Sequence, residues 1–250
     1  MATAVHTEII DRVAVLTLSH PERRNALNIE LSGKLADAVA AVTADDGVGA
    51  VVITGADPAF CAGGDLTELA TADPPTLRRV YAGFLAVADC PLPTIAAVNG
   101  AAVGAGLNLA LACDLRLAGP RARFDARFLQ LGLHPGGGYT WMAQRLLGPQ
   151  GAAALTLFGE VVDAAEAARI GLVHRVVDDV LPAAIELAGR AAAAPRELTV
   201  ATKATMRLTA GPLTHAEAVD VEVAPQAESV RSAPFRQRLA ALQAAISGNR

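Results

Sequence analysis

Two segments rich in glycine and alanine are the parts of this 250-residue sequence best suited to chemistry. The first runs from Phe60 to Leu66 and the second from Ala97 to Asn108. Glycine lets a ligand approach the main chain closely, and N–H groups at the start of a helix attract negative charge. With Gly64 expected to open a short helix, both segments could present N–H groups to a developing oxyanion. The alternatives are a flexible loop for the first segment and, for the second, a small-residue helix packed against a sheet.

The residues around these glycines exclude two common phosphate-binding motifs. The fingerprint G-x-G-x-x-G, begun at Gly104, requires glycine where Leu109 stands. No glycine-rich stretch is followed by G-K-[ST], so a phosphate-binding P-loop is absent as well.

The side chains that could transfer protons form a small set. Imidazole is the side chain best matched to proton transfer near neutral pH, so His134 is the best candidate, followed by Asp125 and Glu68. The alternatives are that His134 only bonds to the backbone before Pro135, that Asp125 pairs with a neighbouring arginine, and that Glu68 faces solvent. There is no H-E-x-x-H motif and no carboxylate cluster, so we expect neither a metal nor any other separate cofactor.

The hydrophobic pattern predicts an α/β core. An alternating hairpin is expected over 5–18 with its turn at Asp11-Arg12, and four short apolar runs are typical of strands. These runs are Ala50–Thr54, Thr94–Val98, Asp114–Ala118 and Val173–Val177. Helical patterns lie between them. One begins after Asn28, which is expected to be its N-cap, and others begin at Gly104 and near Asp163. Strands that alternate with helices imply right-handed crossovers and a largely parallel sheet.

The C-terminal part of the chain shows only helical patterns. Four helices are expected beyond Leu181, separated by Pro195, Gly211-Pro212 and Pro234. We therefore predict an α/β core over 1–195 and a helical region over 196–250.

Composition narrows the class of protein further. A net charge of −4 argues against nucleic acid as a partner. The apolar runs are far shorter than the ~20 residues of a membrane span, and the N-terminus lacks the pattern of a signal peptide. Three widely spaced cysteines fit a reducing compartment. The sequence predicts a cytoplasmic protein with no membrane partner.

Four motifs in matching order make the chain resemble the crotonase (enoyl-CoA hydratase/isomerase) superfamily from about Thr7 to Ala241. They are PERRNALN from Pro21, FCAGGDL from Phe60, the stretch Ile95–Asp114, and GLHPGGG from Gly132. The resemblance implies a spiral of ββα units with a helical tail that assembles trimers, often paired as hexamers. It also implies an acyl-CoA thioester as the ligand, with coenzyme A entering as part of the substrate.

The resemblance assigns roles to particular positions. The N–H groups of Gly64 and Ala105 would form the oxyanion hole for the thioester carbonyl. Six residues would lie along the pantetheine and nucleotide: Arg24, Ala26, Leu27, Ala62, Asp65 and Leu66.

Two positions depart from the family pattern. Hydratases of the family use two glutamates to position and deprotonate water, and these positions are Asn108 and Phe128 here. Asn108 is either a satisfied polar helix residue or an anchor for water or substrate, and Phe128 is expected to form a wall of the acyl pocket. The nucleophilic aspartate of related dehalogenases would stand at Gly136, so that chemistry is absent too.

Three functions remain open on the sequence alone. The chain could be an enoyl-CoA hydratase or isomerase with His134 moving protons, or a non-catalytic acyl-CoA-binding protein. It could also be a crotonase with other chemistry, such as thioester hydrolysis or decarboxylation.

Overall fold

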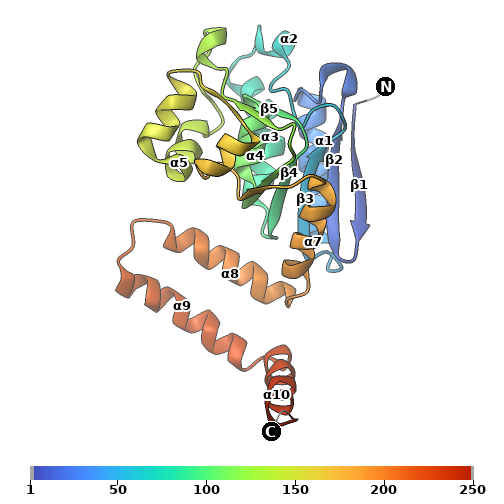
Figure 1. The fold of residues 1–250 in the computed structure, drawn as a ribbon, viewed down its shortest axis with the longest axis vertical. Coiled ribbons are helices and arrows are strands. Elements are labelled where there is room, and N and C mark those ends of the chain that lie inside the picture. The colour runs from blue at the N-terminus through green and yellow to red at the C-terminus, as the bar shows by residue number, and fades with distance from the viewer. Residues whose placement is uncertain (1–2, 249–250) are drawn as a thin grey trace. The chain divides into compact units, whose positions relative to one another are not determined.

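The computed structural model describes residues 3–248, which divide into two compact units between Ala192 and Ala193 (Figure 1). The N-terminal unit contains every strand of the described chain, and the C-terminal unit is helical. This confirms the predicted fold class of an α/β core with helices at the C-terminal end.

The larger sheet has six strands in the order β1-β2-β3-β4-β6-β9. They are β1 (Ala4–Ile10), β2 (Val13–Ser19), β3 (Ala50–Gly55), β4 (Thr94–Val98), β6 (Leu115–Ala118) and β9 (Arg175–Val176). Only β1 and β2 are antiparallel, and the turn between them places Asp11 and Arg12 at φ 45° and 70°. Two successive positive φ values are typical of the tight turns whose twist matches a hairpin. The strand expected over 173–177 is shorter, the one expected from Asp114 begins at Leu115, and the hairpin and the other two strands form where they were predicted, with ends that differ by at most one residue.

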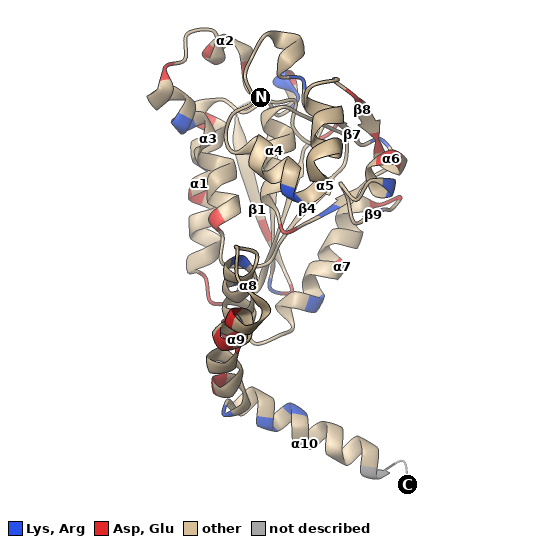
Figure 2. Ribbon diagram, turned by 90° about the vertical axis from the view of Figure 1, so that its left-hand side faces the viewer, with Lys and Arg blue, Asp and Glu red and all other residues tan. Residues whose placement is uncertain are grey.

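Side chains on the two faces of this sheet pack against different helices. Alternate residues such as Val13, Val15 and Val52 face helix α7 (Val180–Ala192). Figure 2 shows α7 on one side of the strands, with α1 (Ile29–Ala44) and α3 (Pro74–Asp89) on the other. Both faces are therefore covered, which explains why the strands read as continuous apolar runs.

A second, smaller sheet has three strands in the order β5-β7-β8. Its strands are β5 (Ala101–Val103), β7 (Arg123–Asp125) and β8 (Val161–Asp163). A single parallel bridge between Cys61 and Ala102 extends this sheet. Successive turns of the chain thus supply a strand to the larger sheet, a strand or bridge to the smaller one, and then a helix.

Each of the three passages from the larger sheet to the smaller one is followed by a helix. These helices are α3, α4 (Ala105–Ala112) and α5 (Tyr139–Thr156). The sequence pattern predicted α4 but not α3 or α5, although Val80, Phe84 and Val87 of α3 are buried at helical spacing. Asn28 caps α1 as expected, because its Oδ1 accepts a hydrogen bond from the N–H of Leu31 at 2.7 Å. The helix predicted from Asp163 forms as α6 (Ala164–Arg169).

The C-terminal unit consists of α8 (Arg196–Thr209), α9 (His215–Val230) and α10 (Ala233–Gly248). Figure 2 shows acidic residues along α9 and basic residues on α10. The acidic residues are Glu217, Asp220, Glu222 and Glu228, and the basic ones are Arg236 and Arg238. Apolar side chains of both helices are exposed: Val219, Val223, Val230, Phe235, Leu239, Leu242 and Ile246.

Within residues 3–248, no helix combines the length and the apolar character that crossing a membrane requires.

Candidate active site

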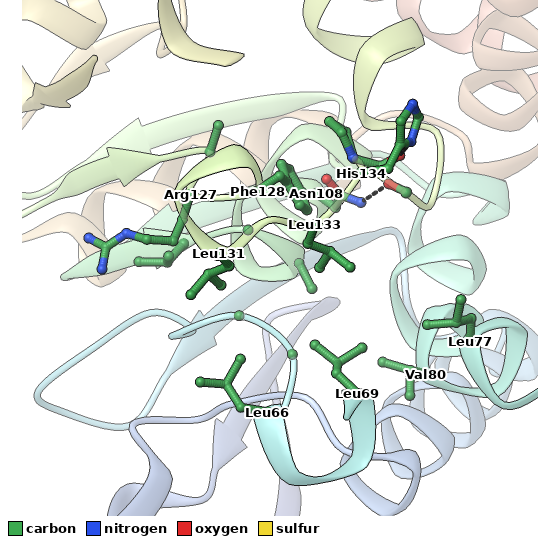
Figure 3. Close-up of a pocket in the computed structure, with 18 of the residues that line it drawn as sticks. Leu66, Leu69, Leu77, Val80, Asn108, Arg127, Phe128, Leu131, Leu133 and His134 are labelled. Carbon is green, nitrogen blue, oxygen red and sulfur yellow. Dashed lines mark hydrogen bonds between the residues drawn. The ribbon is translucent and has the colours of Figure 1, made fainter. Parts of the chain in front are cut away.

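A cavity of about 420 Å³ opens in the N-terminal unit between α3, α4 and the segments around Gly64 and Phe128. Figure 3 shows leucine side chains on both sides of it. Its apolar wall includes Leu66, Leu69, Leu77, Val80, Leu131 and Leu133. Four lining residues carry polar side chains: Tyr81, Asn108, Arg127 and His134. The cavity therefore suits an apolar chain with few polar atoms.

The two glycine-rich segments lie side by side at this cavity. The N–H of Cys61 donates to the oxygen of Ala101 at 3.0 Å, and the N–H of Val103 donates to the oxygen of Cys61 at 3.0 Å. A Cβ at Gly106 would meet the oxygen of Cys61 at 2.1 Å, so only glycine permits this approach. The bridge holds the start of α4 against the turn that carries Gly64.

The main-chain N–H groups of Gly64 and Ala105 both belong to residues that line the cavity. Gly104 precedes α4 with φ 49° and ψ −112°, a conformation that residues with a Cβ rarely adopt. Ala105 is then the first residue of the helix, where an N–H has no intrahelical partner. Neither N–H donates a hydrogen bond to another residue of the described chain. Two donors are thus available at one wall of the cavity.

A second main-chain ladder joins the predicted coenzyme A segment to the same loop. The N–H of Ala62 donates to the oxygen of Arg24 at 3.0 Å, and the N–H of Leu27 donates to the oxygen of Gly63 at 2.7 Å. Asn25 anchors this segment from within the core, because its Nδ2 donates to the oxygen of Ala59 at 2.8 Å. Arg24 is exposed and Ala26 nearly buried, whereas Leu27 has no exposed surface and serves to support the loop. None of these three lines the cavity itself.

Asp65 and Glu68 hold the loop in place through their carboxylates. Asp65 lies outside the cavity lining and caps helix α2 (Leu66–Leu69), accepting from the N–H of Thr67 at 2.8 Å. Burial opposes ionisation of Asp65, but the hydrogen bonds from Thr67 and Glu68 outweigh it and lower its pKa. Glu68 does not simply face solvent, as one reading of the sequence had it. Its Oε2 accepts from the N–H of Ile29 at 2.8 Å, at the start of α1.

Asn108 and Phe128, at the two family glutamate positions, both line the cavity. The Nδ2 of Asn108 donates to the oxygen of Gly136 at 2.8 Å (Figure 3). Its Oδ1 is buried and has no hydrogen-bond partner among the described residues. The ring of Phe128 is nearly buried, with its centroid 5.1 Å from that of Tyr139. The amide is therefore only half satisfied, and Phe128 contributes an apolar surface.

Two of the other polar lining residues, Arg127 and His134, form bonds within the protein. Arg127 forms an ion pair with the buried carboxylate of Asp125, with its Nε 2.7 Å from Oδ2. His134 is exposed, and its Nδ1–H donates to the oxygen of Pro135 at 2.7 Å. Figure 3 shows the imidazole turned away from the leucines of the cavity. The geometry leaves Nε2 of His134 as the one ring nitrogen able to exchange a proton.

Tyr81 also lines the cavity, although the sequence did not predict it as a site residue. A Cβ at Gly136 would meet its hydroxyl oxygen at 2.3 Å, so the phenol fills the space that a side chain at 136 would take. Burial raises the pKa of Tyr81, and the hydroxyl stays protonated near neutral pH. Tyr81 could have been predicted as a site residue from its position on the apolar face of α3, but the sequence analysis did not predict that helix.

Comparison with known proteins identifies the family. The family model for enoyl-CoA hydratase/isomerase matches residues 8–242. The chain belongs to this family. It is 57% identical over 240 residues to the probable enoyl-CoA hydratase EchA14 of Mycobacterium tuberculosis H37Rv, with 92% of this chain and 94% of that protein covered.

Solved structures of family members share the fold. An enoyl-CoA hydratase from Polaromonas sp. JS666 superposes with a TM-score of 0.90 at 30% identity, covering 96% of this chain and 97% of that one. A candidate enoyl-CoA hydratase from Thermobifida fusca YX, solved in complex with CoA, gives 0.83 at 33% identity, covering 91% and 93%. The crotonase resemblance inferred from the four motifs is thereby confirmed.

Proposed function

We propose that this family member binds an acyl-CoA thioester and stabilises negative charge on its carbonyl oxygen with the N–H groups of Gly64 and Ala105. The observation that carries the proposal is the pair of unengaged donors at the wall of an apolar cavity. Enolate formation next to a thioester places charge on that oxygen, and one well-placed donor is worth about 2.7–4 kcal/mol in the transition state. The CoA complex of the Thermobifida fusca relative supports the ligand class.

We assign the coenzyme A moiety to the outer side of the loop that carries Gly64. Arg24 is exposed beside Ala62, and its guanidinium would suit the phosphates of the nucleotide. We assign Ala26 and Asp65 to the same part of the ligand, while Ala62 and Leu66 line the cavity. The acyl chain would then pass between the leucines toward Phe128.

Efficient hydration is not part of this proposal, because the cavity offers no carboxylate among its described lining residues. Asn108 and Phe128 cannot take a proton from water at neutral pH, and the carboxylates of Asp125 and Glu68 are already engaged. The same observation favours two further candidates, namely an acyl-CoA binder without catalysis and a thioester chemistry that relies mainly on the oxyanion hole.

We also propose that the chain assembles into trimers or hexamers through its C-terminal unit. The support is the exposed apolar residues of α9 and α10. The opposite charges of these two helices add to it, since they favour pairing between copies.

The binding proposal is tested by isothermal calorimetry with butyryl-CoA and with free CoA, using two substitutions of one residue. Gly64→Pro removes the donor N–H, whereas Gly64→Ala keeps it at the cost of moving the tip of the Leu69 side chain. We expect Gly64→Pro to weaken butyryl-CoA binding about tenfold or more, and Gly64→Ala to stay within about threefold. Equal affinity in both variants, or no binding of butyryl-CoA by the unaltered protein, would refute the proposal.

A further inference from the structure

Strand β1 lies at one edge of the six-stranded sheet, with β2 on one side and no described strand on the other (Figure 1). Its seven residues include no proline and no lysine, two residue types that often protect an exposed edge from pairing. Ile9 on this strand is 51% exposed. A long edge strand of this kind presents main-chain groups with which another strand can pair.

The direction of these main-chain groups follows from the bonds of β2. The carbonyl oxygen of Leu18 accepts from the N–H of Ala56 at 2.8 Å, so the even-numbered residues of β2 point toward β3. Main-chain groups alternate in direction along a strand, and the odd-numbered residues of β2 therefore point toward β1. They lie opposite the even-numbered residues of β1, as Thr17 lies opposite His6. The residues of β1 that turn their N–H and C=O groups outward are Val5, Thr7 and Ile9.

The outward groups of these three residues are not used elsewhere. Within residues 3–248, none of them forms a hydrogen bond to a segment other than β2. Thr3, which precedes the strand, differs because its carbonyl oxygen accepts from the Nζ of Lys34 at 2.6 Å. The available edge is thus the segment 5–9.

We propose that this edge pairs antiparallel with the same edge of a second copy of the chain, about a twofold axis at Thr7. Thr7 then lies opposite Thr7 of the other copy, and Val5 lies opposite Ile9. Each of these pairs exchanges both N–H···O bonds, and the exposed side chain of Ile9 gains an apolar neighbour. His6 and Glu8 fall opposite each other in the non-hydrogen-bonded pairs, where side chains approach most closely. An imidazole can donate to a carboxylate, so the one acidic residue of the strand obtains a partner.

The same side chains disfavour the neighbouring registers. A shift by one residue turns the outward groups away from each other, so only shifts by two keep them paired. One such shift places Glu8 opposite Glu8, and like charges directly opposite each other destabilise a strand pair. The other places His6 opposite His6 and Glu8 opposite Ala4, which leaves both carboxylates without the imidazole. The sequence of β1 therefore favours the register centred on Thr7.

This contact would join two trimers into a hexamer, and the inference rests on the proposed assembly through the C-terminal unit. A single pair of strands is a small contact, so chains that lack the C-terminal contact should not pair at micromolar concentration. Two trimers related by twofold axes form one strand pair for each chain of a trimer. These pairs act together, because once one has formed the others are effectively intramolecular.

Light scattering of the full chain at micromolar concentration tests the pairing. We expect six times the chain mass of 25.6 kDa for the unaltered protein and three times that mass for Thr7→Pro. Proline removes the central outward N–H, and an edge strand tolerates it where that N–H is not bonded to the sheet. Thr7→Val is the matched control, since it keeps both the N–H and the β-branch and should remain hexameric. A hexamer in Thr7→Pro would overturn the proposal.

Two charge variants test the register, and they decide the question if circular dichroism shows that Thr7→Pro does not fold. His6→Glu places a carboxylate opposite Glu8 of the other copy and should give trimers. Adding Glu8→His to that chain restores the complementary pair and should restore the hexamer. A hexamer in His6→Glu, or a trimer in the double variant, would overturn the proposal. Trimers in the unaltered protein would overturn it as well and leave the C-terminal assembly standing, whereas monomers would refute both.

Discussion

The side-chain amide of Asn108 is bonded to the main chain of Gly136, 28 residues further along the sequence, at 2.8 Å. One family glutamate position is thus occupied by a neutral group whose N–H is already committed to the loop after Phe128. Because an amide does not titrate in the physiological range, the bond orders the cavity without supplying acid or base.

Hydration of crotonyl-CoA should accordingly be very slow. Positioned acid–base groups contribute about 10²–10⁴-fold each, and both positions lack one. We expect a turnover well below ~1 s⁻¹, measured by loss of the enoyl thioester absorbance with an active hydratase as positive control. A rate within the ordinary enzyme range would mean that another residue has taken over the proton transfer.

Replacing Gly106 should damage the site without touching either donor residue. A Cβ there would meet the oxygen of Cys61 at 2.1 Å and force the two glycine-rich segments apart. We expect Gly106→Ala to weaken butyryl-CoA binding by about tenfold or more and to lower the unfolding temperature. Gly33→Ala on α1 is the matched control, since its Cβ meets nothing within 4 Å. It should bind normally and be about 0.5–1 kcal/mol more stable. Normal binding by Gly106→Ala would show that butyryl-CoA binding does not depend on the close contact between the two glycine-rich segments.

Any residual turnover should depend on His134 more than on Glu68 or Asp125. The bond from Nδ1–H to Pro135 leaves Nε2 free, whereas both carboxylates are engaged. His134→Gln should lower turnover by at least ~10²-fold, with acyl-CoA affinity within a few-fold, and Glu68→Gln should change turnover little. Unchanged turnover in His134→Gln would make this histidine a loop residue and favour the non-catalytic binder.

The three cysteines should resist alkylation in the native protein. Burial raises the pKa of Cys61 to about 12, and Cys90 and Cys113 are buried as well. Since the folded state keeps the Cys61 proton, unfolding becomes easier as the pH rises above the ordinary thiol pKa of about 8.5. Iodoacetamide at pH 8 followed by mass spectrometry should label none of the cysteines natively and all of them in denaturant. Rapid native labelling of Cys61 would show that the loop around it opens.

The C-terminal helices should hold the assembly together. We expect light scattering at micromolar concentration to give three or six times the chain mass of 25.6 kDa. Leu239→Glu with Leu242→Glu places charges among the exposed apolar residues of α10 and should yield monomers. Gln243→Glu adds a charge on the same helix and should leave the assembly intact. A monomer in the unaltered protein would remove the oligomer proposal.

Local chemistry determined much of this structure in advance. The run Ala50–Thr54, the cap at Asn28 and the turn at Asp11-Arg12 appear where the sequence places them, because each depends on neighbours within a few residues. The glycines at 64 and 106 marked the site for the same reason, since a missing Cβ is visible in the sequence. The family followed from four motifs in order, and the matched model confirms it.

Contacts between distant segments were decided only by the tertiary structure. Glu68 reaches the N–H of Ile29, and Tyr81 fills the space beside Gly136, across 39 and 55 residues of chain. Neither follows from spacing, because Glu68 is brought to Ile29 by the bridge between Leu27 and Gly64, and Tyr81 is placed by the packing of α3. The sequence alone shows that Asn108 is an amide where relatives have an acid. Only the fold determines that its N–H is bound to the loop while its oxygen is left without a partner.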